Sequence, residues 1–133
     1  MSEQDVSTLG RAYEAFNRGD IESAVQAFDP QIEWHELEGN PQAAGIFRGI
    51  DAVVNDVFAT IPENWEEFQA DPHDFIDADE HIIVLGHFRG VAKAGSSALD
   101  AHFAHVWRMR DGRAVHFTNY ADTMMWARAM GRA

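Results

Sequence analysis

The sequence predicts an α+β fold in which helices cover one side of a curved antiparallel sheet. Two features of the chain predict it. Hydrophobic residues recur at helical spacing in the first part of the chain, whereas the period becomes two from Trp65 onward. In addition, residues 98–122 have the alternation of two strands joined by a turn at Asp111 and Gly112. The expected order is helices with one strand, followed by an antiparallel meander.

Length and composition limit the possible functions. The 133 residues are enough to bury a core in one domain spanning residues 1–133. The chain contains no cysteine, which excludes disulfides and thiolate catalysis. We find neither a leader pattern nor a hydrophobic run of membrane-spanning length, and therefore expect a cytoplasmic protein that does not bind membranes. The formal net charge of −12 argues against binding to nucleic acid.

Two helices are expected at the start of the chain. The first has a hydrophobic stripe formed by Val6, Leu9, Tyr13 and Phe16. Ser2 is a possible N-cap of this helix, and Gly19 lies where it would stop. The second helix is expected to begin at the Asp20 cap and to end at Pro30.

One short strand and a third helix are expected next. The strand covers residues 32–37 and alternates, so that Ile32, Trp34 and Glu36 share one side. Residues 38–49 are rich in glycine and are expected to form a loop over a cavity mouth. Asp51 can cap a third helix, which would end at Pro62.

The remainder of the chain is expected to form strands and a final helix. The expected strands are residues 65–70, 75–76, 81–94, 98–110 and 113–121, with turns at residues 77–79 and 95–97. A last helix is expected over residues 123–130. Asp122 directly precedes this helix and is better suited to cap it than to act as a catalytic acid.

Two turns are compatible with the last predicted hairpin. A two-residue turn at Asp111 and Gly112 pairs Arg110 with Arg113, whereas a three-residue turn with a bulge pairs Met109 with Arg113. The two alternatives differ by one residue of register, which reverses the facing of one strand relative to the other. The bulged turn separates polar from hydrophobic residues better, so we favour it.

The bulged turn predicts which side chains face a pocket. One face carries Phe103, His105, Trp107, Val115, Phe117 and Asn119. The other face carries His102, Ala104, Val106, Arg108, His116, Thr118 and Tyr120. His105 and Asn119 are then isolated polar groups on an aromatic wall, where each needs a hydrogen-bond partner.

Three segments resemble a known family in the order in which they occur. They are YEAFNRGDIESAVQAFDPQIEW, FRGIDAVVNDVF and FAHVWRMRDGRAVHFTNYADT. Together they resemble the nuclear transport factor 2-like superfamily, in particular its SnoaL-like, ketosteroid-isomerase-related branch. The resemblance implies a cone-shaped, strongly bent antiparallel sheet, also described as a cystatin-like α+β barrel. Helices would pack over its concave face and close a deep hydrophobic cavity, and dimerisation would use the outer sheet face.

The resemblance implies several changes at the positions where the family carries its chemistry. The general-base aspartate of ketosteroid isomerases corresponds to Trp34, and their hydrogen-bonding tyrosine corresponds to Ala12. The neighbouring Tyr13 is expected to point elsewhere. Their second acidic group corresponds to His105, a position at which polyketide cyclases also have histidine. The acid/base aspartate of the cyclases corresponds to Asn119, which can orient a ligand but cannot transfer protons.

The polar residues that remain predict a different site. Glu36 lies on the same face as Trp34, and His105 and Asn119 project toward the same interior. Glu36 and His105 could act as an acid/base pair, because desolvation raises the pKa of a buried carboxyl group and a nearby imidazolium lowers it. Alternatively, Glu36 and His105 form a purely structural hydrogen-bonded pair beneath residues 38–49.

We therefore predict a small-molecule cavity protein that acts on a hydrophobic ligand as a cofactor-independent isomerase, cyclase or hydrolase. Glu36 would be the base, His105 the acid or oxyanion donor, and Asn119 would orient the ligand. The expected ligand-binding side chains are Tyr13, Phe16, Trp34, Phe103, Trp107 and Phe117. The alternative is a non-catalytic binding or carrier module for a hydrophobic metabolite.

No cofactor and no metal ion are expected. His102 and His105 are three residues apart, which places them on opposite faces of a strand. We also expect a homodimer, because the outer face of the predicted hairpin includes Ala104, Val106 and Tyr120 among its charged residues.

Overall fold

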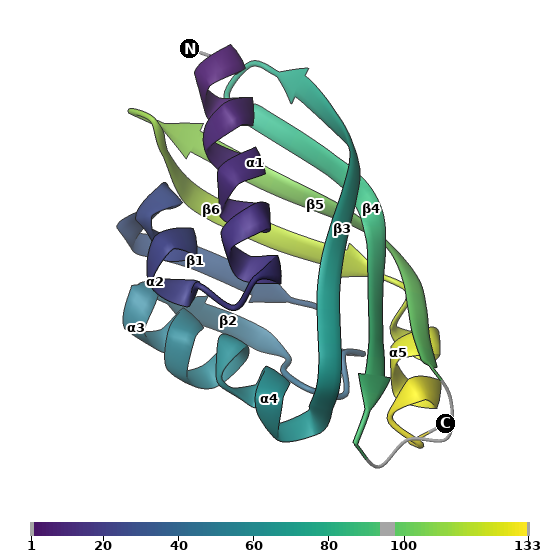
Figure 1. Cartoon of the computed structure of the whole chain (residues 1–133). Coiled ribbons are helices and arrows are strands. Elements are labelled where there is room, and N and C mark those ends of the chain that lie inside the picture. The colour runs from purple at the N-terminus through teal and green to yellow at the C-terminus, as the bar shows by residue number, and fades with distance from the viewer. Residues whose placement is uncertain (1, 94–97, 133) are drawn as a thin grey trace.

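The computed structural model describes residues 2–93 and 98–132 (Figure 1). Its elements follow the chain as α1 (Ser2–Asn17), α2 (Ile21–Ala24), the 3-10 turn η1 (Val25–Ala27), β1 (Phe28–Glu36), β2 (Gly45–Arg48), α3 (Ile50–Ala52), the π-helical segment η2 (Val53–Phe58), α4 (Thr60–Asn64), β3 (Trp65–Ala78), β4 (His81–Ala92), β5 (Ala98–Arg110), β6 (Arg113–Ala121) and α5 (Thr123–Ala129). The α+β prediction is confirmed. The predicted turn at residues 95–97 and the predicted strand end at Ala94 lie outside the described residues.

The six strands form one mixed sheet in the order β2-β1-β6-β5-β4-β3. Strands β3 to β6 are the expected antiparallel meander. The resemblance implied an antiparallel sheet, and the sheet is antiparallel except where β1 pairs with β6 in parallel. Strand β2 pairs with β1 inside the segment that we expected to be a loop. Its four residues alternate between partly buried and exposed, so they show no hydrophobic pattern that would indicate a strand.

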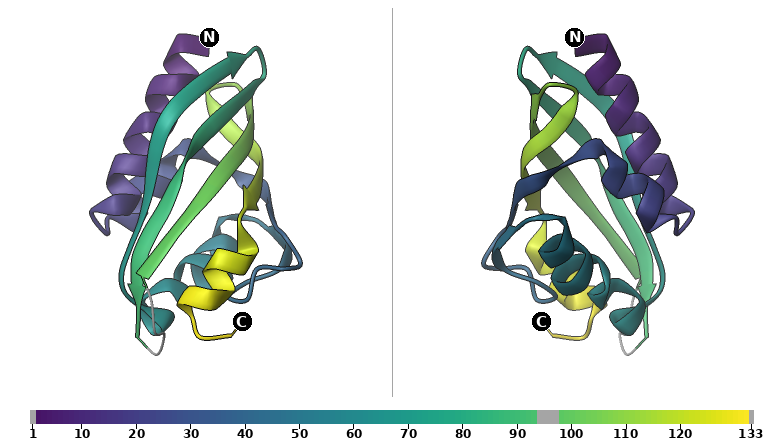
Figure 2. Two further views of the ribbon diagram at one scale, coloured as in Figure 1. Left: turned by 90° about the vertical axis from the view of Figure 1, so that its right-hand side faces the viewer. Right: turned by 90° about the vertical axis from the view of Figure 1, so that its left-hand side faces the viewer.

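Helix α1 lies across the sheet and covers its concave side (Figures 1 and 2). Its hydrophobic stripe is buried: Leu9 is 0% exposed and Tyr13 is 5% exposed. At the end of the helix, Asn17 anchors it to β3 through two hydrogen bonds with the backbone of Ala70, of 2.8 and 2.9 Å. The helix ends before Gly19, which adopts a φ of +82°.

The caps of the short helices were only partly predicted. Asp20 caps α2 by accepting a hydrogen bond from the Ser23 N–H at 3.1 Å, as expected. The third helical region begins after Gly49 and has no side-chain cap, so the expected cap at Asp51 is wrong. Pro62 does not end this region, because it lies in the first turn of α4, where its missing N–H is tolerated.

Within the described residues, no helix is both long and hydrophobic enough to span a membrane.

The turn between β5 and β6 differs from the one that we favoured. Arg110 pairs with Arg113, so Asp111 and Gly112 form a two-residue turn. Both central residues have positive φ, 53° for Asp111 and 79° for Gly112, as a type I′ turn requires. An Asp-Gly pair is well suited to this geometry, because both residues tolerate left-handed backbone.

The predicted assignment of side chains to the two faces of the hairpin is nevertheless correct beyond the turn. Met109 pairs with Ala114 and Arg108 with His116, which leaves Val115 as the extra residue of a bulge. The bulge shifts the register by one residue and so brings Phe117 to the same face as the inner residues of β5. Val115 itself is only partly buried, and Ala114 takes the inner position that was expected for it.

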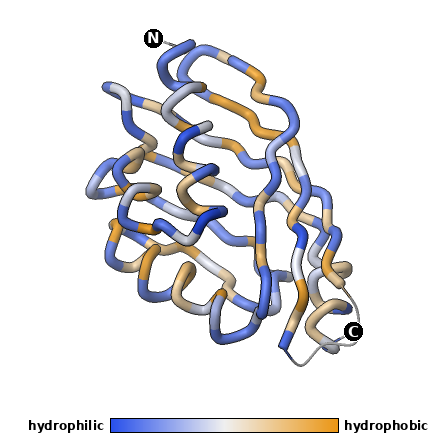
Figure 3. Tube along the Cα trace, in the orientation of Figure 1, coloured by the Kyte–Doolittle hydropathy of each residue, from blue (hydrophilic) through white to orange (hydrophobic). Residues whose placement is uncertain are grey.

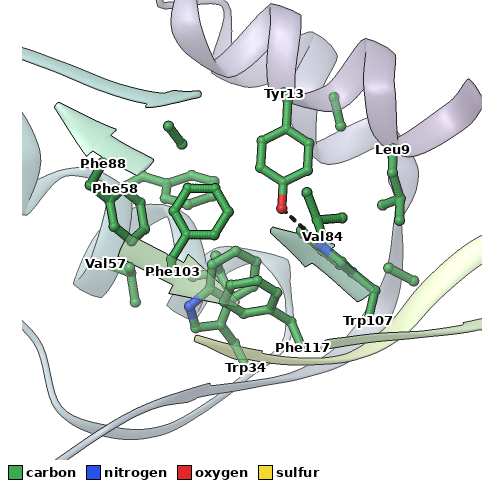
Figure 4. Close-up of a cluster of buried hydrophobic side chains, with 14 of the residues drawn as sticks. Leu9, Tyr13, Trp34, Val57, Phe58, Val84, Phe88, Phe103, Trp107 and Phe117 are labelled. Atoms are coloured by element: carbon green, nitrogen blue, oxygen red, sulfur yellow. Dashed lines mark hydrogen bonds between the residues drawn. The ribbon is translucent and has the colours of Figure 1, made fainter. Parts of the chain in front are cut away.

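Aromatic side chains form a cluster within the core between the sheet and α1 (Figure 4). Trp34 and Phe117 pack closely, with ring centroids 3.8 Å apart. Trp107 packs against Phe117 at 4.4 Å and against Phe28 at 5.7 Å. Figure 3 shows hydrophobic and hydrophilic stretches interleaved along the strands, which is typical of strands with one buried face.

Gly86 of β4 permits a close approach between β4 and β3. A Cβ atom at this position would overlap the carbonyl oxygen of Asp71 and would lie 2.7 Å from the Phe103 ring. The register between β3 and β4 shifts beside it, between Pro72 and Asp74. Any larger side chain at Gly86 would therefore push the strands apart where the sheet is irregular.

We expect Gly86→Ala to destabilise the fold by about 1 to 3 kcal/mol, because the new methyl group meets backbone that cannot move freely. The matched control is Gly10→Ala in α1, where a Cβ atom would meet nothing within 4 Å. That change should stabilise the protein by roughly 0.5 to 1 kcal/mol. Urea unfolding of both variants measures the two effects, and a Gly86→Ala variant as stable as wild type would contradict the packing argument.

Candidate functional site

A cavity lies between the concave face of the sheet and the helices. Its volume is about 70 Å³, several times the space that one water molecule needs. Its hydrophobic wall includes Ala12, Tyr13, Phe16, Phe28, Trp34, Val57, Phe58, Phe68, Phe88, Trp107, Phe117 and Trp126. Its polar lining consists of Glu36, Asn40, Gln42, His105 and Asn119. A hydrophobic wall with a few grouped polar side chains is typical of the lining of a small-molecule site. The volume is well below the roughly 300 to 1,000 Å³ of sites for drug-sized ligands, so this cavity suits only a small ligand.

Glu36, the last residue of β1, projects into this cavity and is 8% exposed. Its carboxyl group accepts hydrogen bonds from Trp34 Nε1 at 2.7 Å, Asn119 Nδ2 at 2.9 Å and Asn40 Nδ2 at 3.2 Å. All three donors are uncharged. Burial therefore dominates and raises the pKa of Glu36 to about 7, although these hydrogen bonds act in the opposite direction.

Asn40 is a site residue that the sequence analysis missed. It is 7% exposed, and besides its bond to Glu36 it accepts a hydrogen bond from the Gln42 N–H at 2.9 Å. Gln42 in turn accepts from Trp65 Nε1 at 2.6 Å and donates to Thr60 at 2.8 Å. These bonds fix the connection between β1 and β2 over the cavity. The sequence contained one signal for it: Asn40 lies four positions after Glu36 in a turn-forming segment, where Asn is common.

Tyr13 lies inside the site, so the expectation that it points elsewhere is wrong. Trp107 Nε1 donates to the Tyr13 hydroxyl oxygen at 3.0 Å, a bond drawn in Figure 4. The Tyr13 hydroxyl donates to His105 Nδ1 at 2.5 Å. Burial raises the pKa of Tyr13, which keeps the phenol neutral. The hydrophobic stripe of α1 was the better guide to this residue, because stripe positions face the core.

His105 is neutral and carries its proton on Nε2. We assign this tautomer from the network: the Tyr13 oxygen already accepts from Trp107, so its O–H group donates to Nδ1, and a neutral imidazole has one N–H group. His105 is 3% exposed, and burial lowers its pKa to about 3. A neutral ring is a hydrogen-bond donor through Nε2. It does not act as a general acid in the imidazolium form near neutral pH.

Three buried polar atoms in the cavity wall have no hydrogen-bond partner among the described residues. They are Nε2 of His105, Oδ1 of Asn119 and Nε1 of Trp126. Two are donors and one is an acceptor. Because unpaired buried polar groups are costly, a ligand that pairs with them would gain binding energy.

Glu36, Asn119 and His105 form one row across three neighbouring strands. Glu36 pairs with Asn119 between β1 and β6, and Asn119 pairs with His105 between β6 and β5. Two strand spacings separate Glu36 from His105, roughly 10 Å between their backbones. The expected direct contact between Glu36 and His105 is therefore wrong, and Asn119 lies between them.

The other predicted ligand-binding residues are mostly in the cavity wall. Tyr13, Phe16, Trp34, Trp107 and Phe117 line it, as expected. Phe103 is the exception: it is buried but stacks on the His105 ring, with centroids 3.8 Å apart, and does not line the cavity. Asp122 caps α5 by accepting a hydrogen bond from the Met125 N–H at 3.2 Å. Trp126 and Phe58 line the cavity and were not predicted.

One group of histidine and acidic side chains in the described part of the chain could share a metal ion. It consists of Glu33, His35 and His116 and lies outside the cavity, on the convex face of the sheet.

Comparisons with known proteins agree with the fold. Residues 9–117 match the SnoaL-like domain family. The chain belongs to this family. An NTF2-like protein of unknown function from Burkholderia pseudomallei K96243 has a similar structure, with a TM-score of 0.88 and 32% sequence identity. That comparison covers 96% of this chain and 97% of the other.

Two further comparisons are more limited. TerC, co-crystallized with polyporic acid, shares the fold with a TM-score of 0.86 at 22% identity, over 96% of this chain and 98% of TerC. An uncharacterized protein of Mycobacterium tuberculosis is 40% identical over 50 residues, which are 38% of this chain. The match spans only 37% of the length of that relative.

The pKa of Glu36 predicts how stability depends on pH. The folded-state value of about 7 lies above the unfolded value of 4.5, so this group stabilises the fold below pH 4.5 and this contribution is lost as the pH rises through 7. The loss amounts to about 3 kcal/mol. Gln cannot ionise, so Glu36→Gln lacks this pH-dependent loss. We therefore expect the free energy of unfolding of the variant, relative to that of wild type, to increase from pH 5 to pH 8.

Urea unfolding at a series of pH values measures this difference. The opposing effect of His105 is present in both proteins and cancels in the comparison. The matched control is Glu38→Gln, which removes the same charge from an exposed position two residues away. If Glu36→Gln and Glu38→Gln change the pH dependence equally, the buried carboxyl group does not titrate as described.

Proposed function

We propose that the cavity binds a small, largely hydrophobic carbonyl compound and that Glu36 moves a proton on it, without a cofactor. The reaction class would be that of an isomerase, cyclase or hydrolase. One observation carries this proposal: a carboxyl group with a pKa of about 7 lies at the wall of a hydrophobic cavity. A general acid or base is most effective when its pKa is near the working pH.

Glu36 retains a free position for a substrate proton. An ionised carboxylate offers about four lone-pair sites, and three N–H donors occupy three of them. Oε1 accepts from both asparagines, whereas Oε2 accepts only from Trp34. The remaining site is therefore on Oε2, and Asn119 holds the carboxylate in place.

His105 and Trp126 supply donors for the charge that develops on the substrate. When Glu36 removes a proton from the carbon beside a carbonyl group, the electron pair moves to the carbonyl oxygen and forms an enolate. The Nε2–H of His105, which lies beside the Asn119 side chain, and the Nε1–H of Trp126 belong to residues that line the cavity and would donate to that oxygen. Protonated Glu36 then returns the proton to another position of the same molecule, which completes an isomerisation.

The aromatic wall supports a cyclic or aromatic ligand. Trp34, Phe58, Trp107 and Phe117 surround the space beside Glu36, and aromatic rings bind flat, hydrophobic molecules through large contact areas.

The test is proton exchange between solvent and a bound ketone. We expect the protein to incorporate deuterium beside the carbonyl group of accepted ketones, with a rate that rises with pH around a midpoint near 7. Glu36→Gln should lower that rate by roughly 100- to 10,000-fold with little effect on binding. NMR of a panel of ketones and lactones measures the exchange, and the exposed variant Glu38→Gln is the control. Exchange at the wild-type rate in Glu36→Gln would overturn the proposal.

The second candidate function is binding without turnover, as a carrier of a hydrophobic metabolite. It is favoured by the three N–H donors around Glu36, since a purely structural buried carboxyl group needs the same partners. Quenching of Trp34 and Trp107 fluorescence by a ligand that is recovered unchanged would support it, provided that Glu36→Gln binds that ligand equally well.

We also propose that the protein acts in the cytoplasm as a homodimer joined through the outer face of the sheet. Leu85, Ala104 and Tyr120 form a row across β4, β5 and β6 on that face. Leu85 is 37% exposed and Tyr120 is 50% exposed, which is unusual for hydrophobic residues in a row. Sedimentation at micromolar concentration should show twice the chain mass of 14.9 kDa, and Tyr120→Glu should shift the protein toward the mass of a single chain. A wild-type protein that sediments as a single chain would contradict the dimer.

A further inference from the structure

The convex face of the sheet carries two histidines and a glutamate in one group. Glu33 and His35 are two residues apart on β1, so both point outward while Trp34 between them points inward. On β6, His116 pairs directly with Glu33 in the parallel register. The three side chains are 29 to 36% exposed, which leaves them open to solvent on one side.

The distances between the three side chains match the spacing of metal ligands. His35 Nε2 lies 2.8 Å and His116 Nε2 lies 3.4 Å from the same oxygen of Glu33, Oε2. One ligand atom from each residue lies within 4.8 Å of the other two. Ligands around a tetrahedral zinc ion, each bonded at about 2.1 Å, are roughly 3.4 Å apart. Small side-chain rotations would therefore bring all three ligands to one ion.

We propose that Glu33, His35 and His116 bind one zinc ion on the convex face of the sheet. Two imidazole nitrogens and a carboxylate oxygen are a ligand set that zinc prefers. The backbone hydrogen bonds between β1 and β6 hold the ligands in register, so zinc binding costs little conformational entropy. Solvent can supply the fourth ligand.

The ion would reinforce the strand pair that forms the cavity wall. Glu33 and His116 are neighbours of Trp34 and Phe117, whose rings pack against each other on the opposite face of the same two strands. Bound zinc would therefore connect β1 to β6 directly behind the aromatic wall, and we expect it to stabilise the folded state.

Calorimetric titration of the full chain with zinc sulfate tests the site. We expect one zinc ion per chain, and a loss of affinity of at least 10- to 100-fold in His35→Gln and in His116→Gln, since even residues that only orient a metal ligand contribute that much. Both residues are partly exposed, so these variants should fold, which circular dichroism checks.

The matched control is His102→Gln, on the same face of the sheet. His102 and His87 form a second histidine cluster, with ring centroids 4.0 Å apart, and His87 bonds to Asp100 at 2.6 Å. His102→Gln should bind zinc as wild type does. Zinc affinity unchanged in both His35→Gln and His116→Gln, or lowered equally in the control, would overturn the proposal, and so would the absence of binding at micromolar zinc.

A second measurement uses cobalt chloride, because Co²⁺ occupies zinc sites and absorbs visible light according to its geometry. The wild-type protein should show the visible absorption of a four-coordinate cobalt site, and Glu33→Gln should lose it. The unfolding temperature should rise with zinc in the wild type and stay constant in His116→Gln. A cobalt spectrum identical to that of the hydrated ion would contradict the assigned ligands.

Discussion

The burial of the Glu36 carboxyl group without a cationic partner is the constraint on which the site depends. A carboxylate in such a position loses its hydration, and only uncharged N–H groups replace it. Three separate parts of the chain supply these groups: the strand itself through Trp34, the segment between β1 and β2 through Asn40, and β6 through Asn119. Because no full positive charge compensates the carboxylate, its pKa rises to about 7.

The parallel pairing of β1 with β6 places these donors. Glu36 and Asn119 are 83 positions apart in the chain and become direct neighbours only through this register. A shift of one residue would turn His35 toward the cavity and Glu36 toward solvent, because successive side chains of a strand alternate between its faces. One register therefore determines both the cavity wall and the histidine cluster on the convex face.

The sequence predicted those features of the site that depend on local alternation. The inward positions of Ile32, Trp34 and Glu36 follow from the period of two in β1, and the three residues are buried. The same period correctly placed His105 and Asn119 on one face. The hairpin shows why the result can be right when one step is wrong: the two-residue turn was not favoured, but the bulge at Val115 supplies the same shift of register.

Features that depend on distant partners were not predictable from the pattern. Strand β2 and the role of Asn40 arise only when β1 is already in place, and neither has a hydrophobic period of its own. Tyr13 illustrates a conflict between two signals. The family resemblance assigned the tyrosine position to Ala12, whereas the stripe of α1 placed Tyr13 in the core, and the structure agrees with the stripe.

The opposite pKa shifts of Glu36 and His105 have the same physical cause and a common consequence. Burial disfavours the charged form of both groups, so the carboxyl pKa rises to about 7 and the imidazole pKa falls to about 3. Between these two values both side chains are predominantly neutral, and a hydrophobic ligand meets no buried ion. When a proton leaves the ligand for Glu36, negative charge moves from the carboxylate to the ligand, toward the unpaired N–H groups of His105 and Trp126. At a pH near 7 about half of the molecules carry the ionised carboxylate that can accept a proton, and the cavity provides donors for the charge that then moves to the ligand.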